Sequence, residues 1–241
     1  MKRIKDYTVV DLEMTGLAVR LDRIIEIGAV RVRGGEVADT YAMLVDPRIP
    51  IPQRVAELTG ITDEMTAGGE DMDKAVQGLI DFIGDDVLVG QNIGFDYSFI
   101  KQWAVNHKLS LSMSAYDTLK LARRYLPADM PKKLESLCQY FDINRENAHR
   151  ALDDAVETMQ VFEKLQDIAI EKNDKDFKPQ ELIYKAKKQT PATAHQIERL
   201  REFREKFDIT EPIYWDTLTR SQASRIQDEY ISRYGRLRHR L

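Results

Sequence analysis

Two carboxylates lie in the middle of an apolar run near the start of the sequence, in Val9–Leu17, VVDLEMTGL. In a strand, residues two apart point to the same side, so Asp11 and Glu13 are expected to share one face. Neighbouring carboxylates repel each other and resist burial unless positive charge offsets both effects. Two sources of that charge fit the residues. One is Mg²⁺ or Mn²⁺, which prefer hard oxygen ligands, and the other is a pair of salt bridges to Arg20 and Arg23.

Two later stretches carry groups that suit the same chemistry. In VGQNIGFD, Asp96 follows a buried strand that turns into a helix, and ligands bind at that strand edge in open α/β sheets. Taken alone, Asp96 also fits a helix N-cap. In AHRALDDA, at the start of a long helix, His149 stands five residues before Asp154. A histidine before a helix is more often structural, but three candidate metal ligands elsewhere favour an active site.

The elements that must position these groups follow from apolar periodicity. Strand patterns over 5–11, 24–33 and 37–45, with a Gly34-Gly35-Glu36 turn between the last two, predict an antiparallel meander. Short strands and helices then alternate: strands at 87–89 and 115–116, and helices over about 71–83, 96–106, 117–125, 132–140 and 149–170. A meander followed by strand–helix units predicts an α/β fold with a mixed sheet flanked by helices.

The last third of the chain has a different character. Residues 171–192 are polar and rich in lysine, which predicts a linker or a loosely packed arm. Thr193 and Thr219 each open a T-x-x-Q capping box, so two helices should form a small helical module over 193–241. The arginines near the C-terminus fit either contacts to nucleic-acid phosphates or a solvated end; they are Arg233, Arg236, Arg238 and Arg240.

Composition limits the classes of protein. The chain has 241 residues, 43% of them hydrophobic, which is enough for a full core. It has no apolar run of the roughly 20 residues that a membrane span needs, and its N-terminus lacks the pattern of a signal peptide. A single cysteine, Cys138 in an apolar pattern, predicts a small buried side chain. We therefore expect a cytoplasmic protein with no membrane partner.

Charge is unevenly distributed. Residues 1–171 contain 20 Lys and Arg against 29 Asp and Glu, whereas residues 172–241 contain 16 against 11. An acidic body with a basic end is compatible with a polyanionic partner for that end, or simply with a solvated charged surface.

Three motifs, in this order and spacing, resemble the DEDDh family of 3′–5′ exonucleases. The family includes the epsilon proofreading subunit of DNA polymerase III and the exonuclease domain of polymerase C. The resemblance covers about residues 5–167, and flanking words such as ELTGIT, YDTL and LESL also look like the family. The motifs are Asp11-x-Glu13 with Thr15-Gly16, Asn92-x-x-x-Asp96, and His149-x-x-x-x-Asp154.

The resemblance implies a ribonuclease H-like exonuclease domain over 1–170, followed by the linker 171–192. It implies hydrolysis of the 3′-terminal phosphodiester with two Mg²⁺ or Mn²⁺ ions, held by the four motif acids, and with His149 as general base. It also implies partners: single-stranded 3′ ends, and a DNA polymerase subunit as a further one. The expected metal ligands are Asp11, Glu13, Asp96 and Asp154, and the expected substrate contacts are Met14, Thr15, Leu17, Leu58 and Asn92.

Several alternatives stay open at this point. Asp153 competes with Asp154 as the fourth ligand, although neighbours on a helix point about 100° apart and the family spacing favours Asp154. Leu58 fits an ordinary core position, and Asp117 fits a helix N-cap better than a metal site. Gln91 stands where many relatives have histidine, which bears on local orientation. The rival functions are an exoribonuclease, a ribonuclease H-type endonuclease, and a binding module without turnover.

Overall fold

The computed structural model describes residues 2–145 and 149–237. A six-stranded mixed sheet forms its centre, in the order β3-β2-β1-β4-β5-β6. The strands are β1 (Tyr7–Met14), β2 (Ile24–Arg33), β3 (Glu36–Leu44), β4 (Leu88–Gly90), β5 (Ser114–Asp117) and β6 (Gln180–Glu181). The first three form the predicted antiparallel meander, and β4 and β5 add to β1 in parallel. Gly34 and Gly35, both with positive φ, make the two-residue turn between β2 and β3.

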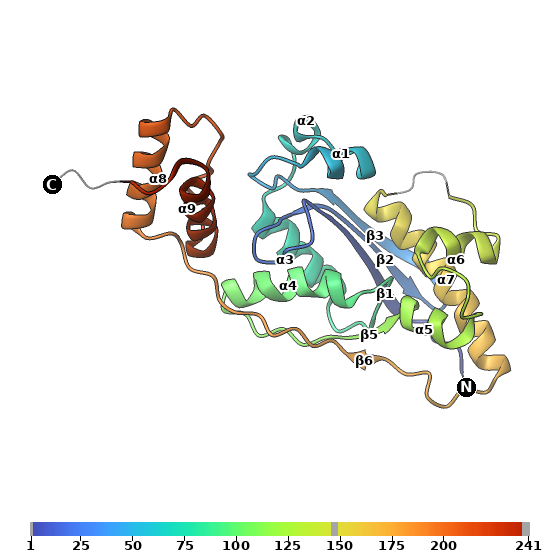
Figure 1. The fold of residues 1–241 in the computed structure, drawn as a ribbon. Coiled ribbons are helices and arrows are strands. Elements are labelled where there is room, and N and C mark those ends of the chain that lie inside the picture. Colours follow the sequence, from blue (N-terminus) through green and yellow to red (C-terminus); the bar gives the residue numbers. More distant parts are fainter. Residues whose placement is uncertain (1, 146–148, 238–241) are drawn as a thin grey trace.

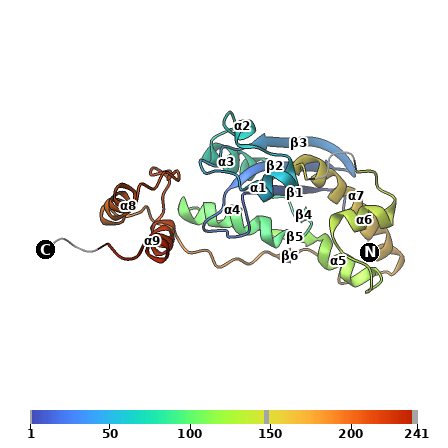
Figure 2. The same cartoon turned by 45° about the horizontal axis from the view of Figure 1, so that its top comes forward.

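Helices cover both faces of the sheet (Figures 1 and 2). The first group comprises α1 (Gln53–Thr59), α2 (Asp63–Thr66), α3 (Met72–Ile83) and α4 (Gly94–Asn106). The second comprises α5 (Thr118–Tyr125), α6 (Leu134–Phe141) and α7 (Ala151–Glu171). Val10 and Leu12 of β1 lie in a core with α3 and α4, whereas Tyr7 and Val9 lie in a second core with Phe162 of α7. The alternation of β1 therefore separates two layers of core.

Most predicted elements agree with the structure, and the differences are local. The strands β1 and β3 are offset from their predicted ranges by one to three residues. The short helices α1 and α2 and the strand β6 were not predicted. Helix α1 has no capping side chain, and β6 is two residues long, so neither carries a strong local signal. Cys138 is buried as predicted.

The C-terminal residues form a helical pair, α8 (Ala194–Phe207) and α9 (Arg220–Tyr234). Both predicted capping boxes are present, with Gln196 and Gln222 completing them. In both views the pair lies at the opposite end of the molecule from α5 and α6 (Figures 1 and 2). The segment before it is not a loose linker: β6 adds to the sheet edge beside β5, and the side chain of Gln102 donates to the Lys187 carbonyl at 2.9 Å.

Within the described residues, no helix is long and apolar enough to cross a membrane.

Candidate active site

Asp11 and Glu13 lie on the face of β1 that is turned toward α7. Val9, two residues earlier, packs in the core beneath Phe162 of α7, and strand alternation places Asp11 and Glu13 on the same side. Val10 faces the opposite core. The paired carboxylates thus share one face, as the sequence predicts.

Asp96 lies beside β1 because β4 separates from β1 before the end of that strand. The parallel β4 pairs with β1 only through Thr8 and Val9, and α4 begins four residues after the end of β4. The Leu12 amide then donates to Asp96 Oδ1 at 3.1 Å. Asp96 is buried and is the third residue of α4, whose N-cap position is Ile93, so the simple N-cap interpretation of Asp96 is wrong. The hydrogen bond fixes this carboxylate beside β1.

The start of α7 brings the third motif to the same place. One ligand atom each of Glu13, His149 and Asp154 lies within 4.8 Å of the others. Asp154 is only 7% exposed, and Asp153 is not part of this group. His149 has a left-handed backbone, with φ at 64°. The positions favour Asp154 over Asp153, in line with the family spacing.

Gly28 permits this close approach of α7. It pairs with Asp11 across the β1–β2 ladder. A Cβ atom on Gly28 would lie 2.1 Å from the Ala151 carbonyl carbon and 2.3 Å from the Leu152 nitrogen. The first turn of α7 therefore rests directly on the backbone of β2, and only glycine leaves it room.

An ion pair between a buried carboxylate and a half-exposed guanidinium holds the same turn, and sequence reasoning missed it. Glu26 lies directly opposite Glu13 in the ladder and is 6% exposed. Arg150 donates to Glu26 through Nε at 3.0 Å and a terminal nitrogen at 2.7 Å, and the Ala151 amide adds a bond at 2.8 Å. Glu26 thus anchors the residues that follow His149. The available signal was an acid inside the apolar strand IIEIGAV and an arginine directly after His149.

Replacing Arg150 with lysine tests this anchor. Lysine keeps the charge but loses the two-point geometry of the guanidinium, so the start of α7 should shift. We expect hydrolysis of the substrate to fall by about a hundredfold, the typical cost of an ångström-scale misplacement in an active site. The reciprocal variant Glu26→Gln keeps an acceptor for the Ala151 amide and should lose less. Equal, wild-type rates for both variants, measured at saturating Mg²⁺, would show that the pair does not position the site.

The proposed salt bridges from Arg20 and Arg23 are absent. Arg23 donates to the carbonyls of Leu21 and Asp22, and Arg20 donates to Ser221 Oγ at 2.7 Å. Across residues 2–145 and 149–237, no lysine or arginine forms an ion pair with Asp11, Glu13 or Asp96. The salt-bridge interpretation of the first motif is therefore wrong for the described residues.

Crowded carboxylates raise each other's proton affinity. Burial, then the charges of Asp96, Asp154 and Glu13, hold the pKa of Asp11 well above its usual range. Burial and the neighbouring Asp154 raise the pKa of Glu13 to about 8. Burial raises the pKa of Asp96 to about 7, although the hydrogen bond from the Leu12 amide acts in the other direction. The carboxylates of Asp11, Glu13 and Asp96 thus repel one another and have no lysine or arginine partner within the described residues. A bound divalent cation would stabilise their charged forms.

The pKa shifts predict how the metal-free protein responds to pH. Unfolded Glu13 ionises near its ordinary pKa of 4.5, whereas folded Glu13 keeps its proton until about pH 8. Between these values the folded state binds more protons, so the free energy of unfolding falls as pH rises. Thermal melts in EDTA should show a Tm that declines between pH 5 and 8, and saturating Mg²⁺ should lessen the decline. A Tm in EDTA that rises over this range would contradict the shifts.

Arg145, which precedes α7, forms ion pairs with two carboxylates of that helix. Arg145 lies 2.7 Å from Asp154 Oδ1 and 2.7 Å from Glu157 Oε2, and Glu157 is 5% exposed. Burial raises the pKa of Glu157 to about 7, against the opposing effect of Arg145. Sequence reasoning missed both residues. Glu157 follows Asp154 by three positions, and on a helix that spacing puts both on one face.

Two of the predicted substrate contacts are exposed apolar side chains. Leu17, in the loop after β1, is 79% exposed, and Leu58 on α1 is 56% exposed. The interpretation of Leu58 as a core residue is therefore wrong. Exposed leucines offer apolar surfaces on which a ligand can pack.

The other predicted contacts are placed differently. Thr15 is buried, and its hydroxyl donates to Asp22 and accepts from the Arg23 amide at 3.0 Å, so its side chain shapes the loop. Met14, the last residue of β1, is partly buried. Asn92 is exposed with φ at 58°.

Gln91 and Asp117 have structural partners. Gln91 donates to the Lys132 carbonyl at 2.7 Å and accepts from the Thr118 hydroxyl, which ties β4 to the segments around α5 and α6. Asp117 is the N-cap of α5, as predicted. It also accepts a hydrogen bond from the Asn92 amide at 3.1 Å.

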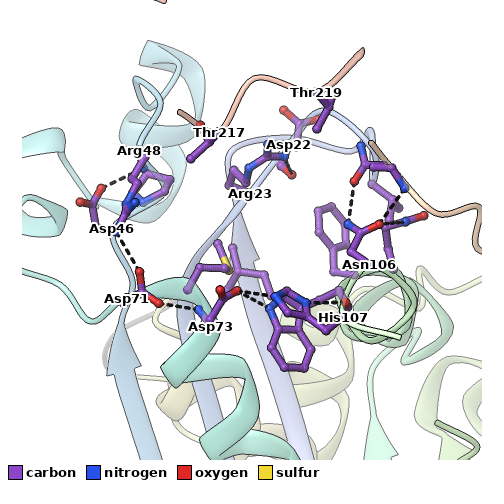
Figure 3. A pocket seen from close by; sticks show the side chains of 18 of the residues that line it. Asp22, Arg23, Asp46, Arg48, Asp71, Asp73, Asn106, His107, Thr217 and Thr219 are labelled. Carbon is purple, nitrogen blue, oxygen red and sulfur yellow. Dashed lines mark hydrogen bonds and ion pairs between the residues drawn. The ribbon is translucent and has the colours of Figure 1, made fainter. Parts of the chain in front are cut away.

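A cavity of about 420 Å³ lies at the junction with the helical pair, not at this site. Neither the four motif acids nor His149 line this cavity. Figure 3 shows several of its polar groups paired with one another: Asp73 accepts from Trp103 Nε1 at 2.8 Å and contacts His107 Nε2 at 3.1 Å.

Comparison with known proteins assigns the family. A model described as "Exonuclease" matches residues 8–162. DNA polymerase III PolC-type from Clostridium perfringens is 40% identical over 158 residues, which is 65% of this chain and 11% of that protein. DNA polymerase III subunit epsilon from Aquifex aeolicus is 33% identical, covering 66% of this chain and 79% of the relative. The chain thus spans about a tenth of the PolC-type relatives.

Solved structures agree on the fold. The nuclease domain of 3′hExo, described as a DEDDh family member bound to rAMP, superposes with a TM-score of 0.60 at 17% identity, covering 74% of this chain and 98% of that one. The chain belongs to the exonuclease family, and residues 8–162 form an exonuclease domain with a ribonuclease H-like fold.

Proposed function

We propose that this protein is a metal-dependent 3′–5′ exonuclease that releases nucleoside monophosphates from the 3′ end of DNA, and that it acts in the cytoplasm in proofreading or repair. The observation that carries the proposal is the convergence of Asp11, Glu13, Asp96, His149 and Asp154 on one end of β1. Family membership adds independent support.

The four carboxylates would hold two divalent cations. Asp11 would be the ligand shared between them, since the charges of Asp96, Asp154 and Glu13 all raise its pKa. When bound, such a pair supplies charge stabilisation for the attacking and leaving oxygens of an in-line displacement at phosphorus. Arg145 would have to give up at least part of its contact with Asp154.

His149 would take the proton from the attacking water. An imidazole changes charge near neutral pH and so suits this task. A ring nitrogen of His149 lies within 4.8 Å of one carboxylate oxygen each of Glu13 and Asp154, which places it beside the proposed metal ligands. The ion pair between Glu26 and Arg150, next in the chain, would hold the ring in position.

The terminal nucleotide would lie between Leu17 and Leu58. These exposed leucines come from the loop after β1 and from α1, and would pack against the base. The Met14–Thr15 backbone and Asn92 would complete the contacts. We also propose the division into an exonuclease domain over 1–170, an arm over 171–192 and a helical module over 193–241. The polymerase relatives support a DNA polymerase subunit as a partner.

The test uses one sequence in four forms: single-stranded DNA, single-stranded RNA, and a primer annealed to a template with a paired or a mispaired 3′ end. The proposal predicts Mg²⁺-dependent shortening of DNA, faster at the mispaired end than at the paired end. Faster degradation of RNA than of DNA would replace the substrate assignment with an exoribonuclease. Internal fragments in place of mononucleotides would overturn the exonuclease assignment.

A further inference from the structure

A basic groove lies where the loop after β1 meets α9. It is lined by Ala18, Val19, Arg20, Leu21, Tyr184, Ser221 and Arg225. This set, called here the junction groove, contains two guanidiniums and a phenol ring but no carboxylate. Its residues come from three separate segments: the exonuclease domain, the arm and the helical module.

The groove is built by specific contacts across the junction. Arg20 donates to Ser221 Oγ at 2.7 Å, and the Gln222 side chain donates to the Leu21 carbonyl at 3.3 Å. Gln189 of the arm donates to the Arg20 carbonyl at 2.5 Å. The helical module is therefore fastened to the same loop that begins at the end of β1.

The two arginines of the groove have guanidinium N–H groups that no described residue accepts from. Arg20 and Arg225 are both exposed. Arg225 makes no hydrogen bond or ion pair within the described residues, and Arg20 uses one of its nitrogens on Ser221. The arm beside them, residues 183–192, carries Lys185, Lys187 and Lys188 and no acid, and these lysines are exposed. Positive charge thus continues from the groove along the arm.

Tyr184 supplies an aromatic surface within this charge. It packs partly against the core beneath α4, so its ring is held in place, while it still lines the groove. Phosphate-binding cations interleaved with an aromatic ring are the features with which proteins bind single strands without sequence preference.

The groove lies close to the candidate active site along the chain. Leu17 and Arg20 are three residues apart, which limits their separation to about 11 Å. That is about three nucleotides of a stacked strand. A strand whose 3′ end lies beside Leu17 meets Arg20 within a few nucleotides.

We propose that the junction groove binds the phosphates of the single strand 5′ to its reacting end, with a base against Tyr184, so that the helical module extends the substrate track. The proposal rests on the proposed exonuclease function for its geometry. Its arginines and the ring of Tyr184, however, would bind a single strand whether or not the protein hydrolyses it.

The test measures binding by fluorescence anisotropy in EDTA, with labelled dT20 and dT3, at NaCl concentrations from 50 to 200 mM. For Arg20→Ala/Arg225→Ala, we expect dT20 to bind about tenfold more weakly and the log–log salt slope to fall by about 1.4, since each phosphate contact on a single strand contributes about 0.7. Binding of dT3, whose two internal phosphates are too few to extend from the reacting end across the groove to Tyr184 and Arg225, should stay within about twofold.

Matched variants keep the test sharp. Arg199→Ala/Arg236→Ala removes the same charge from positions of the module that do not line the groove and should leave dT20 binding within about twofold. Arg20→Lys/Arg225→Lys should restore the salt slope, and Tyr184→Leu should weaken dT20 about fivefold, because a stacked base contributes at least that much. Thermal melts identify any variant that does not fold.

A small substrate separates this proposal from the proposed function. Wild type and the double alanine variant should hydrolyse the p-nitrophenyl ester of dTMP at equal, Mg²⁺-dependent rates. If neither protein hydrolyses the ester or DNA, the exonuclease assignment fails while the binding data still decide the groove. Unchanged dT20 affinity, equal losses for dT20 and dT3, or an equal loss in the Arg199/Arg236 control would overturn the groove proposal.

Discussion

Replacing Asp11 with asparagine should abolish nucleotide release while raising the stability of the metal-free protein. Burial, then the charges of Asp96, Asp154 and Glu13, hold the pKa of Asp11 well above its usual range. Removing the charge relieves this repulsion, so the Tm in EDTA should rise at pH 8. The same change removes the proposed shared metal ligand, and release should fall by at least about a thousandfold, equivalent to about 4 kcal/mol of lost charge stabilisation.

The matched control is Asp153→Asn, one residue before the proposed ligand Asp154 and outside the carboxylate group. It should retain activity within a few fold and show no rise of Tm. Mg²⁺ should stabilise wild type and Asp153→Asn but have little effect on Asp11→Asn. If Asp11→Asn keeps its activity, or if Asp153→Asn loses as much, the assignment of ligands is wrong.

Replacing Gly28 with alanine should be nearly as damaging, although Gly28 carries no chemistry. The new methyl group would overlap the Ala151 carbonyl carbon at 2.1 Å, and backbone atoms cannot turn aside as a side chain can. Helix α7 must then move away from β2, which displaces His149 and Asp154 together. We expect a loss of stability of about 1–3 kcal/mol and a fall in kcat of about a hundredfold or more.

Gly68→Ala is the control, because a Cβ atom at Gly68 meets no atom within 4 Å and its φ is not positive. It should match wild type in Tm and in kcat. Denaturant unfolding and steady-state rates on the same preparations give both quantities. A Gly28→Ala protein with full activity would show that α7 need not rest on β2 for the site to form.

The residues of the candidate site could be predicted from the sequence because their spacing within single strands and helices determines which way their side chains point. Asp11 and Glu13 share a face by strand alternation alone, and the position of Asp96 after a buried strand places it at the ligand-binding edge of the sheet. The predicted bounds of β2 and α3 agree with the structure to within one residue for the same reason. Long segments with strong apolar periodicity can be recognised from local sequence alone.

What could not be predicted depends on contacts between distant segments. Glu26 and Arg150 are 124 residues apart, and only the folded chain shows that they meet. The role of Gly28 depends likewise on a helix more than 120 residues later. The arm over 171–192 has the composition of a linker, yet β6 and the hydrogen bonds of Gln189 fix it to the domain. Local sequence carries no record of such partners.

The most direct test of the account is the digestion of 5′-labelled single-stranded DNA by the wild-type protein, with Mg²⁺ or with EDTA, followed over time on a sequencing gel. The account predicts a ladder that shortens one nucleotide at a time from the 3′ end with Mg²⁺, and an intact strand with EDTA. A folded protein that leaves the strand intact with Mg²⁺ and with Mn²⁺, or that cuts it equally well in EDTA, would contradict it.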